Sequence, residues 1–141
     1  MEITKTQLDS LLSEAKKAAH TAYAPYSKFR VGSSVLTDIG IFSGHNIENA
    51  SSPLGICAER AALIHAHIVG ARQIYAIAVW CHDATTAFTE SNINNETMPC
   101  AACRQWFVEL APEAVVITNG SSRVFTVAEL LPHPFRLRVN P

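Results

Sequence analysis

The sequence predicts a single α/β domain over residues 1–141, in which helices cover both faces of a five-stranded mixed sheet and give three layers (α-β-α). Three observations predict it. The length of 141 residues suits one domain with a buried core. Helix-like and strand-like apolar periods follow one another in the order α-β-β-α-β-α-β-β-α. The run Ile74 to Trp80 is continuously apolar, as is usual for a central strand covered on both faces.

The first helix is predicted over Lys5 to His20, where leucine and alanine recur at helical spacing. Thr4 and Gln7 form a plausible capping box at its start, and Pro25 blocks any continuation. Two β-type runs follow, Val31 to Thr37 and Ile41 to His45. The turn residues between them predict an antiparallel hairpin.

The second half continues with a helix over Cys57 to Val69, for which Gly70 is a natural stop. After the central strand, Ala101 to Leu110 is predicted as a helix that ends before Pro112. Val115 to Thr118 and Arg123 to Thr126 are predicted strands. Their connection is too short for a crossover helix, so they should pair antiparallel.

The end of the chain predicts one more short helix. Thr126 and Glu129 make a second candidate capping box, and Pro132 ends the helix. Ser91 to Glu96, rich in Asn and Ser, is the most loop-like stretch of the sequence.

Composition narrows the classes of function. The net charge is −1 and no run of Lys or Arg occurs, which disfavours a nucleic acid polymer as partner. No continuous apolar stretch predicts a signal peptide or a membrane span, so we expect a cytoplasmic protein. In a reducing cytosol the four cysteines are expected to be metal ligands or free thiols rather than disulfides.

Two separated clusters predict a catalytic zinc site. Cys57 in the first cluster, with Cys100 and Cys103 in the second, supplies three thiolates. Three ligands leave one tetrahedral position open for water, as catalytic zinc sites do. Cys57 and Cys100 also stand where helices should begin, and the partial positive charge of a helix start lowers the pKa of a thiol.

The neighbours of these cysteines suggest further roles. Glu59 can reach a zinc-bound water and carry protons without being a ligand; the alternative is an ordinary exposed helical glutamate. Arg60 and Arg104 are placed to donate hydrogen bonds to the cysteine sulfurs, the alternative for each being a surface charge. A fourth ligand from Cys81 would instead make a closed, structural zinc site, although a small buried apolar role for Cys81 is favoured. Among the histidines, only His45 is expected near the pocket.

Five segments of the sequence resemble the zinc-dependent cytidine deaminases of the small, single-domain type. Deaminases of this kind include members with a three-cysteine zinc site and a catalytic glutamate that is not a zinc ligand. The resemblance runs through most of the chain, over the segments Tyr23 to Phe29, Gly44 to Ala50, Leu54 to Arg60 and Pro99 to Gln105, with Glu129 to Pro132 near the end.

The resemblance implies roles for individual residues. Phe29 would pack against the pyrimidine ring, Asn46 and Glu48 would bind the ribose hydroxyls, and the backbone N–H of Ala58 would contact the base carbonyl. It also implies one Zn²⁺ per subunit and a homotetramer whose active sites are shared between neighbouring subunits.

The implied reaction is hydrolysis of cytidine and 2′-deoxycytidine to uridine and deoxyuridine with loss of ammonia, in pyrimidine salvage, with Glu59 shuttling protons. Two alternatives stay open. One is a deaminase for another aminated nucleoside, such as an antibiotic of the blasticidin S type. The other is a structural zinc or interaction module.

Four departures from the family pattern concern the pocket. Met98 stands where the family usually has Ser, Ala101 where it usually has Gly, and Ser52 where it often has Tyr. The segment from Cys81 to Thr97 is longer than expected. We expect these residues to alter the space around the exocyclic N4 atom, so that substituted cytidines are accepted or excluded differently.

Overall fold

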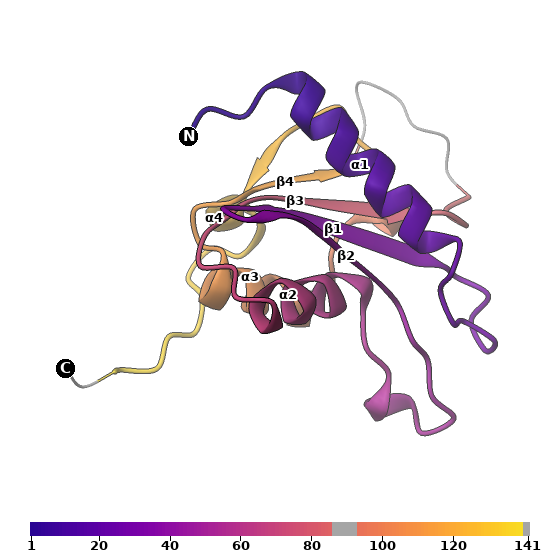
Figure 1. The fold of residues 1–141 in the computed structure, drawn as a ribbon. Helices are drawn as coiled ribbons and strands as arrows, with labels where there is room; N and C mark the ends of the chain where they lie inside the picture. The colour runs from indigo at the N-terminus through magenta and orange to yellow at the C-terminus, as the bar shows by residue number, and fades with distance from the viewer. Residues whose placement is uncertain (86–92, 140–141) are drawn as a thin grey trace.

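The structure is a computed structural model that describes residues 1–85 and 93–139. Its centre is a five-stranded sheet in the order β2-β1-β3-β4-β5, with α1 on one face and α2 and α3 on the other (Figure 1). The predicted three-layer α/β fold is confirmed. The elements in this part of the chain are helices α1 (Lys5–Ala19), α2 (Ala58–Ile68), α3 (Ala101–Leu110) and α4 (Val127–Leu130), strands β1 (Val31–Thr37), β2 (Gly40–His45), β3 (Ile74–Cys81), β4 (Val115–Thr118) and β5 (Phe125–Thr126), and the single 3₁₀ turns η1 (Ser52–Leu54) and η2 (Asn95–Thr97).

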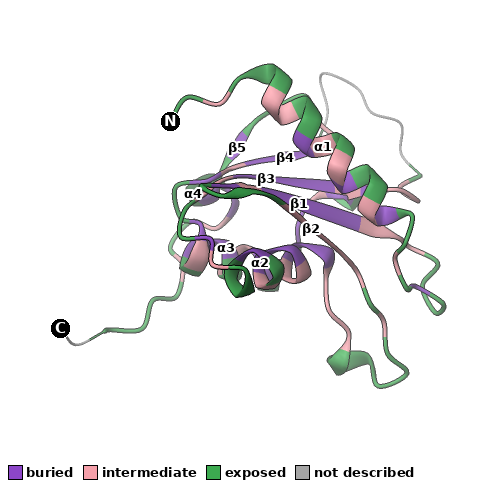
Figure 2. Cartoon of the chain, in the orientation of Figure 1, coloured by how far each residue is buried: buried purple, intermediate pink, exposed green. Residues whose placement is uncertain are grey.

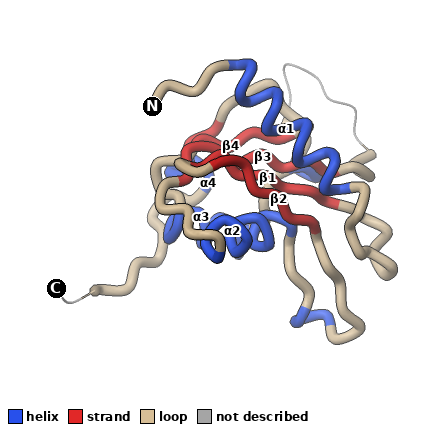
Figure 3. Tube along the Cα trace, viewed as in Figure 1, coloured by secondary structure: helices blue, strands red, loops and turns tan. Residues whose placement is uncertain are grey.

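The sheet is mixed, as predicted. Strand β1 pairs antiparallel with both β2 and β3, β3 runs parallel to β4, and β4 pairs antiparallel with β5. Because β3 and β4 are parallel, their carboxyl ends meet at one edge of the sheet. Figure 3 shows the helices and the strands in separate layers.

Local signals explain the helix ends. Gln7 donates its N–H to Thr4 Oγ1 at 3.2 Å, and Glu129 donates its N–H to Thr126 Oγ1 at 3.1 Å, so both predicted capping boxes form. Gly70 follows α2 with a φ of +98°, a left-handed conformation that glycine adopts without strain.

One predicted strand was wrong in its length, and the stretch predicted as a loop contains part of a short helical turn. The strand predicted over Arg123 to Thr126 contains only its last two residues, because the N–H of Arg123 is donated to Ser121 Oγ in the preceding turn. The loop predicted over Ser91 to Glu96 leads into the 3₁₀ turn η2, whose Asn94 side chain accepts the N–H of Glu96 at 3.0 Å. Residues 91 and 92 lie outside the described residues.

The core has two parts, one on each face of the sheet (Figure 2). Alternation along β3 sends Ala76 and Ala78 toward α1, and Ile77 toward α2 and α3. The smaller cluster joins Leu11 and Ala15 of α1 to β3 and β4. The larger cluster joins Leu63, Phe107 and Val116, among others, and it holds α2 and α3 against the sheet.

Helix α2 lies close to β2 because Gly44 has no side chain. A Cβ at this position would lie only 2.7 Å from the Cβ of Ala61, closer than real Cβ contacts. This approach brings the start of α2 to the edge where β3 and β4 end. No helix in residues 1–85 and 93–139 has the length and apolar composition that crossing a membrane requires.

Candidate active site

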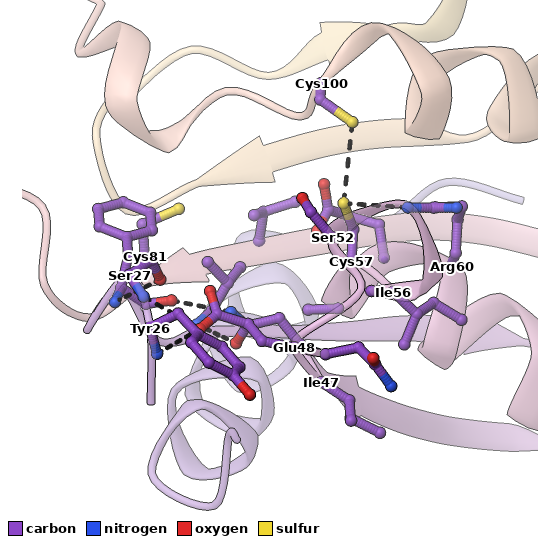
Figure 4. A pocket seen from close by; sticks show the side chains of 18 of the residues that line it. Tyr26, Ser27, Ile47, Glu48, Ser52, Ile56, Cys57, Arg60, Cys81 and Cys100 are labelled. Atoms are coloured by element: carbon purple, nitrogen blue, oxygen red, sulfur yellow. Dashed lines mark hydrogen bonds between the residues drawn. The ribbon is translucent and has the colours of Figure 1, made fainter. Parts of the chain in front are cut away.

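The three predicted ligands meet at the starts of two helices. Cys57 is the N-cap of α2, Cys100 is the N-cap of α3, and Cys103 lies in the first turn of α3. Their sulfur atoms all lie within 4.8 Å of one another, and Cys57 Sγ is 3.8 Å from Cys100 Sγ (Figure 4). Tetrahedral zinc with Zn–S bonds of about 2.3 Å requires sulfurs about 3.8 Å apart. The cluster therefore fits a zinc ion.

The thiols already differ in acidity. A hydrogen bond from the Cys103 thiol, with help from Arg60, lowers the pKa of Cys57 to about 5. The same bond and burial raise the pKa of Cys103. The lowered pKa of Cys57 favours its thiolate, which is the form that binds a metal.

The two arginines behave differently. Arg60 donates Nη2–H to Cys57 Sγ at 3.4 Å, in the place the sequence suggests, while its buried Nε has no hydrogen-bond partner among the described residues. Arg104 donates Nε–H to the carbonyl of Pro99 at 2.8 Å and Nη1–H to that of Leu130 at 2.7 Å. The predicted contact of Arg104 with the sulfurs is therefore wrong: α4 offers it a carbonyl, and it holds the backbone before Cys100 instead.

Glu59 is the buried acid of the site. It is only 4% exposed, and burial, followed by the negative charge of Cys57, raises its pKa to about 7. An ordinary exposed helical glutamate would show neither property. Burial therefore brings the pKa of this carboxyl group toward neutrality, the range in which a general acid–base group can both release and accept a proton.

Glu59, Cys57 and Cys100 line a cavity of about 870 Å³, within the usual size of small-molecule sites, and the buried Cys103 lies behind them. The cavity lies at the carboxyl end of β3, where ligand sites of open α/β sheets are found. The four residues expected to bind substrate all line it, namely Phe29, Asn46, Glu48 and Ala58. Ala58 is the first residue of α2, where backbone N–H groups have no partner within the helix.

The polar side chains of this wall also hold its backbone. Asn46 accepts the N–H of Val31 at 2.8 Å and donates to the carbonyl of Phe29 at 2.8 Å. Glu48 Oε1 accepts the N–H groups of Tyr26 at 3.0 Å and Ser27 at 3.1 Å (Figure 4). The side chain of Ser27, followed by these two backbone groups, lowers the pKa of Glu48. Asn46 and Glu48 therefore fix the segment that carries Phe29.

The structure adds wall residues that the sequence did not single out as substrate contacts. Tyr26, Ser27, Val79, Cys81 and Glu96 line the cavity. Cys81 is buried, which raises its pKa to about 12, and it lies outside the three-cysteine cluster. The only feature of the sequence that pointed to the position of Cys81 was its place at the end of the apolar central strand.

A sharp turn before Phe29 also escaped prediction. Lys28 has a φ of +60°, a conformation for which the sequence offers neither glycine nor asparagine. Its N–H is donated to the carbonyl of Ala24 at 3.0 Å, which closes the turn. The turn brings Phe29 to the cavity wall.

The departures from the family pattern fall at different distances from the cavity. Ser52 and Met98 line it, whereas Ala101 is an exposed residue at the start of α3. His45, at the end of β2, contacts the backbone carbonyl of Asn46 at 3.1 Å.

The long segment after β3 is fixed near both of its ends. Asp83 accepts Nη2–H of Arg30 at 2.8 Å, and Glu96 accepts the N–H of Thr85 at 2.7 Å. Residues 86–92 of this segment lie outside the described residues.

Three cysteine ligands, a buried carboxyl group beside them and an open cavity define a zinc-dependent hydrolytic centre rather than a structural zinc site. Comparisons with known proteins narrow this class. Residues 5–119 match the family model of the cytidine and deoxycytidylate deaminase zinc-binding region, so the chain belongs to that deaminase family.

Individual relatives agree along nearly the whole length. The chain is 40% identical to a cytidine deaminase of Halalkalibacterium halodurans over 89% of this chain and 91% of the relative. It is 41% identical to one of Sporosarcina psychrophila, over 91% and 90%. The crystal structure of cytidine deaminase from Burkholderia pseudomallei superposes with a TM-score of 0.77 at 39% identity, covering 94% of this chain and 100% of that one.

Proposed function

We propose that this chain is a zinc-dependent cytidine deaminase that converts cytidine and 2′-deoxycytidine, with water, into uridine and deoxyuridine plus ammonia, in pyrimidine salvage. One observation carries the proposal: three cysteine sulfurs lie within 4.8 Å of one another, and two of these cysteines, Cys57 and Cys100, line one cavity together with Glu59, which is 4% exposed. The names of the relatives support the same reaction.

Cys57, Cys100 and Cys103 would hold the zinc ion. When bound, zinc supplies Lewis acidity that makes a water molecule reactive at neutral pH. Glu59 moves both protons of the attacking water. Its carboxylate takes the first and passes it to ring N3, which makes C4 more electrophilic. It then takes the second from the hydroxyl group formed on C4 and passes it to the leaving amine, so that ammonia departs and the C4 carbonyl forms. The Glu59 pKa of about 7 suits both directions of transfer. Arg60 offsets part of the negative charge of the thiolates through Cys57.

Substrate recognition is assigned to four other residues of the cavity lining. Phe29 offers an aromatic face to the pyrimidine, and the N–H of Ala58 at the start of α2 is suited to the base carbonyl. Asn46 and Glu48 are assigned to the ribose hydroxyls. Glu48 Oε1 already accepts two backbone bonds, so its second oxygen is the one offered to the sugar.

The charges of the wall support a nucleoside rather than a nucleotide substrate. The cavity is lined by Glu48, Glu59 and Glu96, and its one lining cation among the described residues is Arg60, which binds Cys57. A 5′-phosphate would meet repulsion here without a partner. We therefore expect cytidine to be used far better than cytidine 5′-monophosphate.

We also propose a cytoplasmic homotetramer with shared active sites. At the cavity, Tyr26 is 60% and Ile47 45% exposed, and Leu54 nearby is 70% exposed, which suits coverage by neighbouring subunits. The four cysteines are free thiols, which suits a reducing compartment. Light scattering should give about four times the chain mass of 15.3 kDa. A monomer would contradict the shared site.

The decisive experiment replaces Glu59 and measures two quantities. Glu59→Ala should keep one zinc per chain while cytidine turnover, followed as ammonia release, falls by a factor of about 10⁴. Glu14→Ala, an exposed change on α1, is the matched control and should keep both. Full turnover by Glu59→Ala would remove Glu59 from the mechanism. A wild-type protein that binds zinc but releases no ammonia from cytidine would refute the proposed function.

A further inference from the structure

Behind the cavity, three consecutive residues at the end of β4 bind two different parts of its wall. These residues, Thr118, Asn119 and Gly120, are called the β4 end. They do not occur among the residues that line the cavity. Each nevertheless makes hydrogen bonds to a segment that carries a lining residue or a metal ligand, so their contacts can be followed one by one.

The first set of bonds is a directed chain through two buried hydroxyl groups. Thr97 is 1% and Thr118 2% exposed, and their Oγ1 atoms lie 2.9 Å apart. Thr97 donates its hydroxyl hydrogen to the carbonyl of Asn94 at 2.8 Å. The hydrogen between the two hydroxyls must therefore come from Thr118, whose oxygen in turn accepts the N–H of Gly120 at 3.1 Å.

A backbone bond closes this chain into a ring, because Asn94 donates its N–H to the carbonyl of Gly120 at 3.0 Å. There is no room for a side chain at Gly120. A Cβ there would overlap the side chain of Thr97 and lie 2.8 Å from the Cβ of Asn94. The β4 end and the turn η2 are therefore fitted to each other by both hydrogen bonds and shape.

The second set of bonds reaches the other part of the wall. Asn119 Oδ1 accepts the N–H of Cys81 at 2.9 Å, and Asn119 Nδ2 donates to the carbonyl of Cys81 at 3.0 Å. The N–H of Asn119 is donated to the carbonyl of Val79 at 3.2 Å. Cys81 and Val79 both line the cavity, so the side chain and the backbone N–H of Asn119 together fix the position of the end of β3 there.

The hydrogen bonds between Thr118 and Thr97 matter most for Cys100, because this metal ligand is exposed and is not held in place by core packing. Cys103 is buried in the core, whereas Cys100 is exposed. The backbone runs from Thr97 through Met98 and the buried Pro99 directly to Cys100. The place of the Cys100 sulfur therefore depends on where η2 ends, and η2 is held by Thr118.

We propose that the β4 end is a positioning element of the active site. Thr118, through Thr97, fixes the approach of Cys100 to the other two sulfurs, and Asn119 fixes the Cys81 side of the cavity. These residues touch neither the metal nor the substrate. The metal half of this inference needs only the three-cysteine zinc site, and the cavity half also depends on the proposed deaminase function.

The test measures zinc transfer from the purified holoenzyme to a chromophoric chelator. Thr118→Val keeps the shape of the side chain and removes the hydroxyl. We expect transfer about tenfold faster than in the wild type, the size of effect that one buried hydrogen bond gives. Thr118→Ser keeps the hydroxyl and should restore the wild-type rate.

Val116→Ala is the control for simple destabilisation. Val116 is fully buried in the same strand but belongs to the core cluster that holds α2 and α3. The Val116→Ala variant should have a lower melting temperature than the wild type but the same rate of zinc transfer to the chelator. Equal rates for Thr118→Val and the wild type, or equal acceleration by Val116→Ala, would overturn the metal half. If Thr118→Val does not fold, Thr97→Ala compared with Thr97→Ser tests the same chain from its other end.

Asn119→Ala tests the cavity half. It should raise the KM for cytidine about tenfold while zinc transfer and kcat stay near the wild-type values. An unchanged KM would overturn that half. If the wild type does not deaminate cytidine at all, the proposed function fails, while the order of the zinc-transfer rates still decides the role of Thr118.

Discussion

The sulfur atoms of Cys57 and Cys100 lie 3.8 Å apart although 43 positions separate the two residues in the sequence. Each caps a different helix, and both helices begin at the edge where the parallel strands β3 and β4 end. The metal site is thus made by the layer arrangement of the whole sheet rather than by one local motif.

The first prediction concerns which cysteines hold zinc. Cys100→Ser should purify with little zinc and with a lower melting temperature, because three thiolates are needed to hold the ion and bound metal stabilises the folded state. Cys81→Ser should retain one zinc per chain, because Cys81 lies outside the cluster. Metal analysis of both proteins gives the answer. Zinc loss in Cys81→Ser would revive the closed four-cysteine site.

A second prediction follows from the two bonds of the Asn46 amide. Asn46→Asp can still accept from Val31 but can no longer donate to the carbonyl of Phe29. We expect the free energy of unfolding to fall by about 2 kcal/mol, with a higher KM for cytidine. Denaturant unfolding checks the first value.

The control adds the same charge nearby. Asn49→Asp keeps its bond, because the side-chain oxygen there accepts the N–H of Ser51. Its stability should stay close to that of the wild type. If Asn46→Asp and Asn49→Asp lose the same free energy of unfolding, the added negative charge and not the lost hydrogen-bond donor is the cause.

The third prediction is a pH dependence of stability. Hydrogen bonds from the side chain and the backbone of Arg30 lower the pKa of Asp83 to about 2, from an ordinary value of about 3.9. A lowered pKa in the folded state gives stability that is complete above about pH 4 and is lost as the pH falls toward 2. Asp83→Asn should therefore be less stable at pH 7 by about 1 kcal/mol, a figure reduced for solvent screening.

The measurement is denaturant unfolding of both proteins between pH 7 and pH 2. The difference between wild type and Asp83→Asn should shrink below about pH 4 and vanish near pH 2. Asp9→Asn, which removes an exposed pair with Lys5, should cause little change at any pH. A difference that stays constant down to pH 2 would contradict the role of the Arg30 pair.

A fourth prediction concerns substituted substrates. Met98 lines the cavity two residues before Cys100, where the family usually has serine. Met98→Ser should change the ratio of kcat/KM for N4-methylcytidine to that for cytidine by about tenfold, the usual effect of altering a few pocket atoms. Ala101→Gly is the comparison, since Ala101 is exposed at the start of α3, and its ratio should stay near wild type. The same ratio in all three proteins would show that Met98 does not shape the N4 side.

Much of this arrangement could be predicted because its signals are local. Caps such as Thr4 and Thr126 depend on residues three positions away, and the C-x-x-C spacing of Cys100 and Cys103 fixes both sulfurs on one helical turn. The destination of Arg104 could not be predicted in this way. Its partner carbonyl, at Leu130, lies 26 positions further on and reaches it only through the packing of α4.

The cavity wall shows the same limit. Cys81 and Glu96 join it from segments that no periodicity relates to the cysteines. Lys28 takes its left-handed conformation because the surrounding turn bonds require it, against its intrinsic preference. The positions of side chains that depend on long-range packing can be determined only from the tertiary structure.

The wide separation of the zinc ligands along the chain has a consequence for synthesis on the ribosome. A nascent chain that has emerged only as far as β3 contains just one of the three ligands, Cys57, and cannot form the metal site. Metal capture must wait until α3 has docked beside α2. Loading with zinc therefore marks a chain that has been synthesised at least through α3, and a shorter one competes poorly for the cell's scarce free metal.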